Sequence, residues 1–139
     1  MVDSSAWVAW FKEDDPRHDR AKNLLLREDA NLPPLLMSNL AAYETLTVLS
    51  IRVNKAKSLA FGDWLYRQAI ANGWVKYLFT DELVESKAWQ LFQSTQKKDV
   101  SFVDCVLAVT AQEEKAAGII TFDKHFQTLG AKLGLNIIS

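Results

Sequence analysis

The stretch SFVDCVLAVTAQEEKAAGIITFD, residues 101–123, contains the pattern that decides the fold. Residues 102–115 form a strongly apolar segment of helical length, and residues 118–121 form a short apolar run that fits a buried strand. An acid, Asp123, follows that run directly. The stretch therefore predicts a helix that leads into a buried strand, with a carboxylate at the carboxyl end of the strand.

The same alternation of helical segments and short apolar runs extends along the rest of the chain. Strands are expected at 1–2, 35–37, 74–79, 118–121 and 135–138, and helices at 4–12, from after Pro16 to near Glu28, and at 39–53, 55–71, 81–96 and 102–115. Strands that alternate with helices favour a mostly parallel sheet with helices on both faces. The predicted fold class is α/β, in a single domain over residues 1–139.

Composition excludes several classes of protein. The chain has one cysteine, Cys105, which cannot form an internal disulfide, so a disulfide-stapled secreted module is excluded and a reducing, cytoplasmic location is expected. No apolar run approaches the length of a membrane span, and the first residues do not resemble a signal peptide. With 16 basic and 17 acidic residues the net charge is −1, so no global positive field attracts a polyanion.

Four of the acidic residues stand in unusual places. Asp3 and Asp123 directly follow predicted strands, Glu44 lies in LAAYETLTVL, and Asp104 is the one polar residue in 102–109. Burying an unpaired carboxylate costs several kcal/mol of folding free energy. Such acids are therefore expected to be protonated, paired with cations or bound to metal.

Three of these acids also have a purely local explanation. Asp3 can cap the helix that begins at Ser4, and Asp123 can cap a short turn over 124–129. Ser101 and Asp104 have the spacing of a capping box, in which each side chain accepts a hydrogen bond from the other residue's backbone. Taken one at a time, a cap is the favoured interpretation for Asp104 and Asp123.

A cap does not explain Glu44, which is predicted to lie in the middle of a helix. It shares a helix face with Leu40, Val48 and Ile51, so its carboxylate is expected to point at least partly toward the core.

The predicted topology brings the acids together. The carboxyl ends of parallel strands, and the starts of the helices that follow them, meet at one edge of a sheet. Several carboxylates at one edge repel one another, which makes the arrangement a poor structural device but a good site for Mg²⁺ or Mn²⁺.

Together these residues resemble the PIN-domain nucleases, especially the single-domain VapC-type toxins of toxin–antitoxin pairs. The resemblance rests on Asp3-Ser-Ser, on Ser38 with Glu44 in the next helix, on SFVDCVLA around Asp104 and on ITFDKHF around Asp123, and it covers nearly the whole chain. It implies a three-layer α/β/α fold and a homodimer. It also implies RNA hydrolysis with Mg²⁺ or Mn²⁺ held by the four acids, 5′-phosphate and 3′-hydroxyl products, and a cognate antitoxin that blocks the site.

The chain departs from the family pattern at two points. Only two residues precede Asp3, so the first strand is short or the natural start lies upstream. His125 stands where many relatives carry an acid, and a surface histidine is the favoured interpretation, with substrate contact as the alternative. Ser5 and Thr121 could steady a bound water or a carboxylate, although a local backbone hydrogen bond is the simpler use.

Two further groups of residues remain ambiguous. The basic residues Arg52, Lys55, Lys57, Lys97, Lys98 and Lys124 are candidates for phosphate contacts, or they merely solvate the surface. The five tryptophans are expected to be core and interface anchors, with apolar partner surfaces at 59–64 and 89–92. The alternative functions are a PIN-like interaction module without catalytic metal and a PIN nuclease outside a toxin–antitoxin pair.

Overall fold

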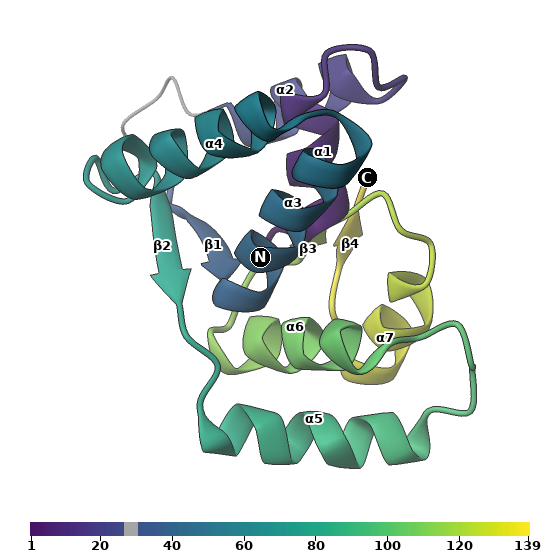
Figure 1. Ribbon diagram of the computed structural model, residues 1–139. Coiled ribbons are helices and arrows are strands. Elements are labelled where there is room, and N and C mark those ends of the chain that lie inside the picture. Colours follow the sequence, from purple (N-terminus) through teal and green to yellow (C-terminus); the bar gives the residue numbers. More distant parts are fainter. Residues whose placement is uncertain (27–30) are drawn as a thin grey trace.

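The computed structural model describes residues 1–26 and 31–139 (Figure 1). In chain order the elements are α1 (Ser4–Phe11), α2 (His18–Leu25), β1 (Leu35–Ser38), α3 (Asn39–Arg52), α4 (Lys55–Trp64), the π-helical turn η1 (Leu65–Ala69), β2 (Val75–Leu78), α5 (Glu82–Ser94), α6 (Phe102–Glu113), β3 (Ile119–Ile120), α7 (Phe126–Leu133) and β4 (Ile137–Ile138). The predicted α/β class is confirmed, whereas helix α7 and the division of the helix expected at 55–71 into α4 and η1 were not predicted. The expected end of the second helix near Glu28 lies outside the described residues.

The amino-terminal residues 1–3 join two pairs of parallel strands. Strand β1 pairs with β2, and β3 pairs with β4. Between these pairs, the backbone N–H of Val2 donates to Leu36 O (2.9 Å), that of Asp3 donates to Ile120 O (2.9 Å), and that of Ile120 donates to Met1 O (2.8 Å). The order across the sheet is therefore β2, β1, residues 1–3, β3 and β4. The first strand expected from the sequence is reduced to a single bridge between Val2 and Ile120.

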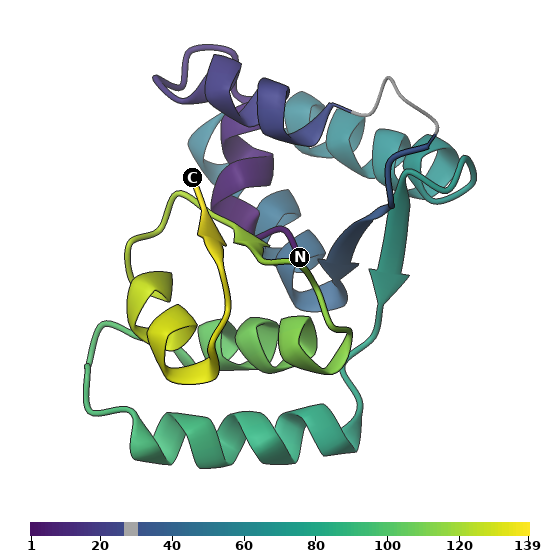
Figure 2. The ribbon, with the colours of Figure 1, turned by 180° about the vertical axis from the view of Figure 1, so that it is seen from behind.

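Helices cover both faces of this sheet, which confirms the three-layer sandwich (Figures 1 and 2). Alternate residues of a strand point to opposite faces. Met1 and Ile119 accordingly belong to the core beneath α5, α6 and α7, whereas Val2 and Ile120 belong to the core beneath α1, α2 and α4. Helix α3 contributes to both cores.

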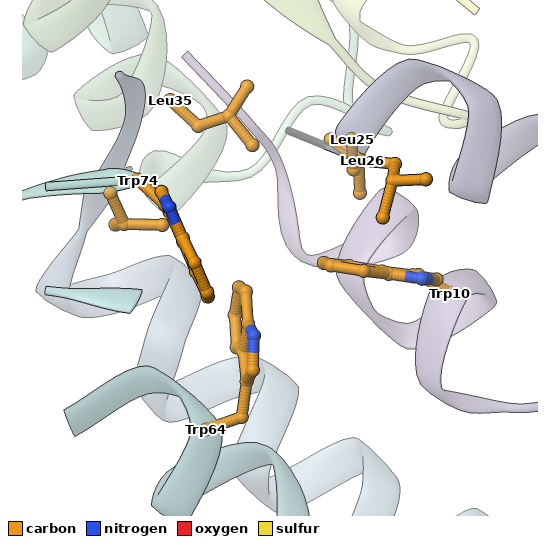
Figure 3. Close-up of a pocket in the computed structure, with 7 residues that line it drawn as sticks. Trp10, Leu25, Leu26, Leu35, Trp64 and Trp74 are labelled. Carbon is orange, nitrogen blue, oxygen red and sulfur yellow. The ribbon is translucent and has the colours of Figure 1, made fainter. Parts of the chain in front are cut away.

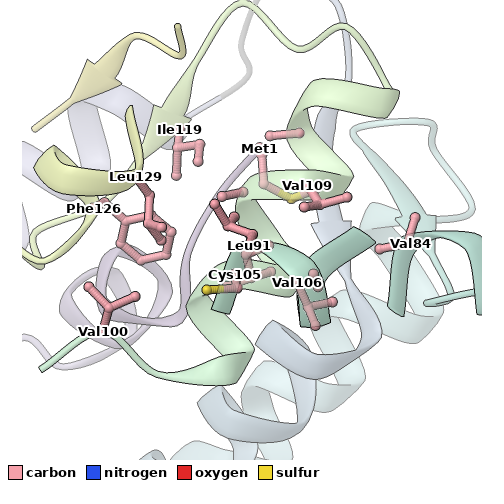
Figure 4. Close-up of a cluster of buried hydrophobic side chains, with 14 of the residues drawn as sticks. Met1, Val84, Leu91, Val100, Cys105, Val106, Val109, Ile119, Phe126 and Leu129 are labelled. Carbon is pink, nitrogen blue, oxygen red and sulfur yellow. The ribbon is translucent and has the colours of Figure 1, made fainter. Parts of the chain in front are cut away.

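Helix α6 supplies more buried residues to the first core than any other element, and Cys105, Val106 and Val109 are three of them (Figure 4). Residues 105–111 of this helix are all buried. The thiol of Cys105 lies in this core, and its burial raises its pKa to about 11. The stretch is strongly apolar because the helix is buried between other helices on one side and the sheet on the other.

An aromatic cluster forms the centre of the second core. Trp7 is fully buried, and its ring lies 5.4 Å from that of Trp64, which in turn lies 5.1 Å from that of Trp10. Beside this cluster is an apolar cavity of about 130 Å³; Figure 3 shows most of its lining, which consists of Trp10, Leu25, Leu26, Leu35, Trp64, Trp74 and Val75. The prediction of core tryptophans is confirmed for Trp7, but Trp89 is 52% exposed.

Side-chain caps start the helices that follow strands β1 and β2. Ser38 accepts a hydrogen bond from Leu40 N (3.2 Å), and Asp81 accepts one from Val84 N (2.9 Å). The described part of the chain contains no helix with the length and hydropathy that a membrane span requires.

Helix α7 is longer than the short turn expected at 124–129. Phe126 and Leu129 are fully buried. A left-handed residue, Gly134 (φ 67°), ends the helix. Packing against β4 stabilises this helix, and packing is a long-range effect that local sequence does not reveal.

The contact between α7 and β4 requires a glycine. A Cβ added at Gly130 would stand 2.7 Å from Ile137 Cγ1 and 2.9 Å from the backbone oxygen of Leu135. We therefore expect Gly130→Ala to lower the free energy of unfolding by about 1–3 kcal/mol through overpacking. The control is Gly62→Ala in α4, where the nearest atom would be Leu46 Cδ2 at 3.4 Å. It should stabilise the chain by about 0.5–1 kcal/mol, as alanine does inside helices. Equal effects in urea denaturation would contradict this account of the packing.

Candidate functional site

The four acids singled out in the sequence line one pocket of about 450 Å³. Each comes from a different part of the chain: Asp3 precedes α1, Glu44 lies on α3, Asp104 lies in the first turn of α6, and Asp123 follows β3. The parallel topology brings them to the edge where β3 and residues 1–3 end. The pocket is open to solvent and more polar than the aromatic cavity beside Trp64.

Asp3 is the most rigidly held of the four. It is 4% exposed, and its Oδ2 accepts hydrogen bonds from Ser5 Oγ (2.6 Å), Thr121 Oγ1 (2.9 Å) and Ser5 N (3.2 Å). The two hydroxyls also accept from backbone: Phe122 N donates to Ser5 Oγ and Asp123 N donates to Thr121 Oγ1, both at 2.9 Å. Thr121 therefore makes both contacts weighed from the sequence, a local backbone hydrogen bond and one to a carboxylate, whereas Ser5 bonds to the carboxylate and to the distant backbone of Phe122.

Asp104 forms the capping box that its spacing from Ser101 predicts. The backbone N–H of Ser101 donates to Asp104 Oδ2 (2.8 Å), and that of Asp104 donates to Ser101 Oγ (3.0 Å). One carboxylate oxygen is thus used by the box, while the residue also lines the pocket. The cap and the site are compatible, because the first turn of α6 lies at the pocket wall.

The expectation that Glu44 points toward the core is wrong. Its side chain is exposed in the pocket, and Ile51, which was placed on the same face, is 77% exposed. The core-facing side of α3 instead carries small residues, Ala41, Ala42 and Thr45, together with Leu49. The face containing Glu44 and Val48 borders the pocket.

Asp123 is tied to the loop that follows it. Its Oδ1 accepts from the backbone N–H of His125 (2.9 Å) and lies 3.1 Å from His125 Nδ1. The other ring nitrogen of His125 lies 3.5 Å from Asp99. His125 is thus a partly exposed side chain between two carboxylates, and Asp99 is a neighbour that no sequence motif indicated.

The acids influence one another electrostatically. Glu44 is exposed as a residue, but the surrounding pocket atoms partly desolvate its carboxylate and raise its pKa; the negative charges of Asp3, Asp104 and Asp123 raise it further, while a hydrogen bond from Ser4 opposes the shift. Burial also raises the pKa of Asp104; the capping hydrogen bonds from Ser101 oppose this shift, and the charges of Asp3 and Asp123 add to it. Ionising either group therefore costs more in the fold than in water, and a bound cation would relieve this cost.

The donor set suits a hard divalent cation. Mg²⁺ and Mn²⁺ prefer carboxylate oxygens and often use only one or two, together with water. Within residues 1–26 and 31–139, however, no three His, Cys, Asp or Glu side chains are arranged as a metal cluster. Local donors such as Ser5 and Ser101 hold individual carboxylates, so the chemistry of the residues fits such an ion while their side chains are not gathered around one point.

Basic residues share the pocket with the acids. Arg17, Arg52 and Lys124 line it. The guanidinium of Arg17 binds Asp15 through Nε (3.0 Å) and a terminal nitrogen (3.1 Å), and it lies over the Phe122 ring at 5.3 Å. Arg52 and Lys124 were candidates from the sequence, whereas Arg17 was missed because nothing in its local sequence distinguishes it.

The comparisons with known proteins agree with this architecture. The chain matches the family described as PIN domain over residues 1–132. It is also similar to the crystal structure of Mycobacterium tuberculosis VapC20, a sarcin-ricin loop cleaving toxin, with a TM-score of 0.79 and 25% sequence identity over 93% of each chain. Comparison with curated proteins gave no match. The resemblance inferred from the four acids is confirmed, and the chain belongs to the PIN domain family, with a fold like that of a VapC toxin.

Proposed function

We propose that the chain is a metal-dependent endoribonuclease that hydrolyses RNA phosphodiesters. The observation that carries this proposal is the convergence of four carboxylates from four separate elements on one open pocket, in a chain of the PIN domain family. The acids of this cluster repel one another, and the hydrogen bonds that they accept from nearby residues do not require them to lie together. The cluster therefore contributes little to the stability of the fold. Its chemistry matches phosphoryl hydrolysis, in which a cation bound by carboxylates acts on a phosphate.

Asp3, Glu44, Asp104 and Asp123 would hold Mg²⁺ or Mn²⁺. When bound, such an ion lowers the pKa of a bound water and neutralises charge that develops on the phosphoryl group. The hydroxyls of Ser5 and Thr121 keep Asp3 in one orientation, because both donate to the same oxygen. His125 limits the rotation of Asp123. The family resemblance implies that water attacks with the 3′ oxygen as the leaving group, which would leave 5′-phosphate and 3′-hydroxyl ends.

We further infer that the chain is the toxin of a toxin–antitoxin pair. The similarity to VapC20, which cleaves the sarcin-ricin loop, supports this role and a structured RNA as substrate. A homodimer and a bound antitoxin would both need apolar surface. Large apolar side chains are exposed on the helices proposed for partner contact, with Leu59 at 57% and Trp89 at 52%.

Metal dependence has two readouts. RNA cleavage by the purified chain should require Mg²⁺ or Mn²⁺ and stop in EDTA. Mg²⁺ should also raise the melting temperature at about pH 8, and by less at about pH 5, because protons compete for carboxylates whose pKa values are raised. Cleavage that continues unchanged in EDTA would refute the mechanism. A chain that neither cleaves RNA nor responds to metal would favour the interaction-module alternative.

Two substitutions separate the two functions of the α6 capping box. Asp104→Asn keeps an oxygen for the Ser101 N–H, so the stability of the chain should change little or rise, while cleavage falls by roughly 100-fold or more. Ser101→Ala removes the other half of the box outside the pocket. It should cost about 0.5–2 kcal/mol of stability and leave cleavage nearly intact. If Asp104→Asn instead lost stability and kept cleavage, Asp104 would be a cap alone.

The toxin role is tested in cells. Expression of the chain alone should arrest growth, the Asp104→Asn variant should not, and the product of the neighbouring gene should co-purify with the chain and restore growth. Light scattering of the purified chain should give the mass of a dimer. A harmless, partnerless chain that still cleaves RNA would be a PIN nuclease outside a toxin–antitoxin pair.

A further inference from the structure

We propose that Arg52 and Lys124 bind phosphates of the RNA next to the phosphate that is cleaved. This inference rests on the proposed nuclease function and adds the residues that position the substrate. It starts from the charge of the pocket, which is lined by four acids and three basic residues. Four carboxylates repel a polyanion, and a bound divalent cation would offset only part of their charge, so basic side chains close by favour the approach of RNA.

The basic residues of the chain differ in whether an acid already holds them. Within residues 1–26 and 31–139, six lysines and arginines form ion pairs: Lys12 with Asp14, Arg17 with Asp15, Lys57 with Glu13, Arg67 with Asp63, Lys76 with Glu114, and Lys87 with Glu113. Arg52 and Lys124 are exposed and form no ion pair with any acid in the described part of the chain. They are therefore the pocket cations that remain available to a ligand.

Arg17 is a poorer candidate although it lines the same pocket. Two of its nitrogens are bound to Asp15, and its guanidinium lies against the ring of Phe122. Binding a phosphate would require it to leave a bidentate partner. We assign Arg17 to the pocket wall.

Arg52 occupies the far end of one helical stripe. Glu44, Val48 and Arg52 follow one another at intervals of four residues on α3, and all three line the pocket. Eight residues of helix separate Glu44 from Arg52 by about 12 Å along the axis. Arg52 therefore lies beyond the phosphate that the acids would hold and suits a neighbouring one.

Lys124 approaches the pocket from a different element. It directly follows Asp123 in the connection between β3 and α7, and its side chain is exposed. Because Asp123 is fixed by His125 and by Thr121, the backbone that carries Lys124 is fixed with it. Two cations on separate elements would fix the direction of an RNA strand across the acids.

The basic cluster at the junction of α3 and α4 provides a matched control. The structure separates its three members: Arg52 lines the acid pocket, Lys57 binds Glu13 at 2.6 Å, and Lys55 does neither. Lys55 is exposed, three residues from Arg52 and of the same charge. If only the net charge of the chain mattered, removing Lys55 or Arg52 would weaken RNA binding equally. If Arg52 contacts a phosphate, its removal would weaken binding more.

The test measures how RNA binding depends on salt. In the Asp104→Asn background, in which cleavage is expected to be roughly 100-fold slower, a fluorescein-labelled RNA stem-loop is titrated in Mg²⁺ at several KCl concentrations. Arg52→Ala and Lys124→Ala should each reduce the slope of log K against log [KCl] by about 0.7–0.9, the value for one lost phosphate contact. Lys55→Ala and Arg52→Lys should leave the slope unchanged. A residue with a merely structural role would not change the slope by the amount that one phosphate contact contributes.

Cleavage kinetics in the otherwise unaltered chain give a second measurement. Arg52→Ala and Lys124→Ala should raise KM by about tenfold with little change in kcat, because they remove binding away from the reacting phosphate. Slopes and KM values equal to those of Lys55→Ala, in a chain that still binds and cleaves RNA, would overturn this inference and leave the nuclease function standing. A chain that neither binds nor cleaves RNA would overturn both.

Discussion

The sheet depends on backbone hydrogen bonds made by only three residues. Residues 1–3 lie between β1 and β3, and without their bonds to Leu36 and Ile120 the two strand pairs would have no common edge. The same segment places Met1 in one core and Val2 in the other. Asp3 follows at once, so the first carboxylate of the site is fixed by the contacts that hold the sheet together. Residues 1–3 therefore both complete the sheet and position a carboxylate of the candidate site.

The other three acids are held less tightly, and the difference has a physical basis. Asp3 is buried and receives several hydrogen bonds, whereas Glu44 is exposed and Asp104 and Asp123 each accept bonds from the turn that carries them. Local donors stabilise each carboxylate separately against the repulsion of its neighbours. If the acids gathered around a cation, some of these local hydrogen bonds would be replaced by bonds to the cation. A rigid Asp3 with more adjustable partners suits such an exchange.

Much of the fold could be predicted because its signals are local. The capping box follows from the Ser101–Asp104 spacing, and the edge position of Asp123 follows from the strand before it. The length of α7 could not be predicted, because it depends on packing against β4. The exposed position of Glu44 and the presence of Arg17 at the pocket depend on how distant helices meet. The sequence indicated which acids converge and included Arg52 and Lys124 among the candidate cations, but it did not indicate Arg17.

The neighbours Asp104 and Cys105 face two different environments from the same turn of α6. The carboxylate lines the open pocket, while the thiol is buried with a pKa of about 11. Alkylating reagents attack the thiolate, so Cys105 becomes reactive only when α6 separates from the helices and strands around it. That opening would also displace Asp104 from the pocket. The rate at which Cys105 is alkylated therefore reports how often α6 opens and the site is lost, and it can be measured without any substrate.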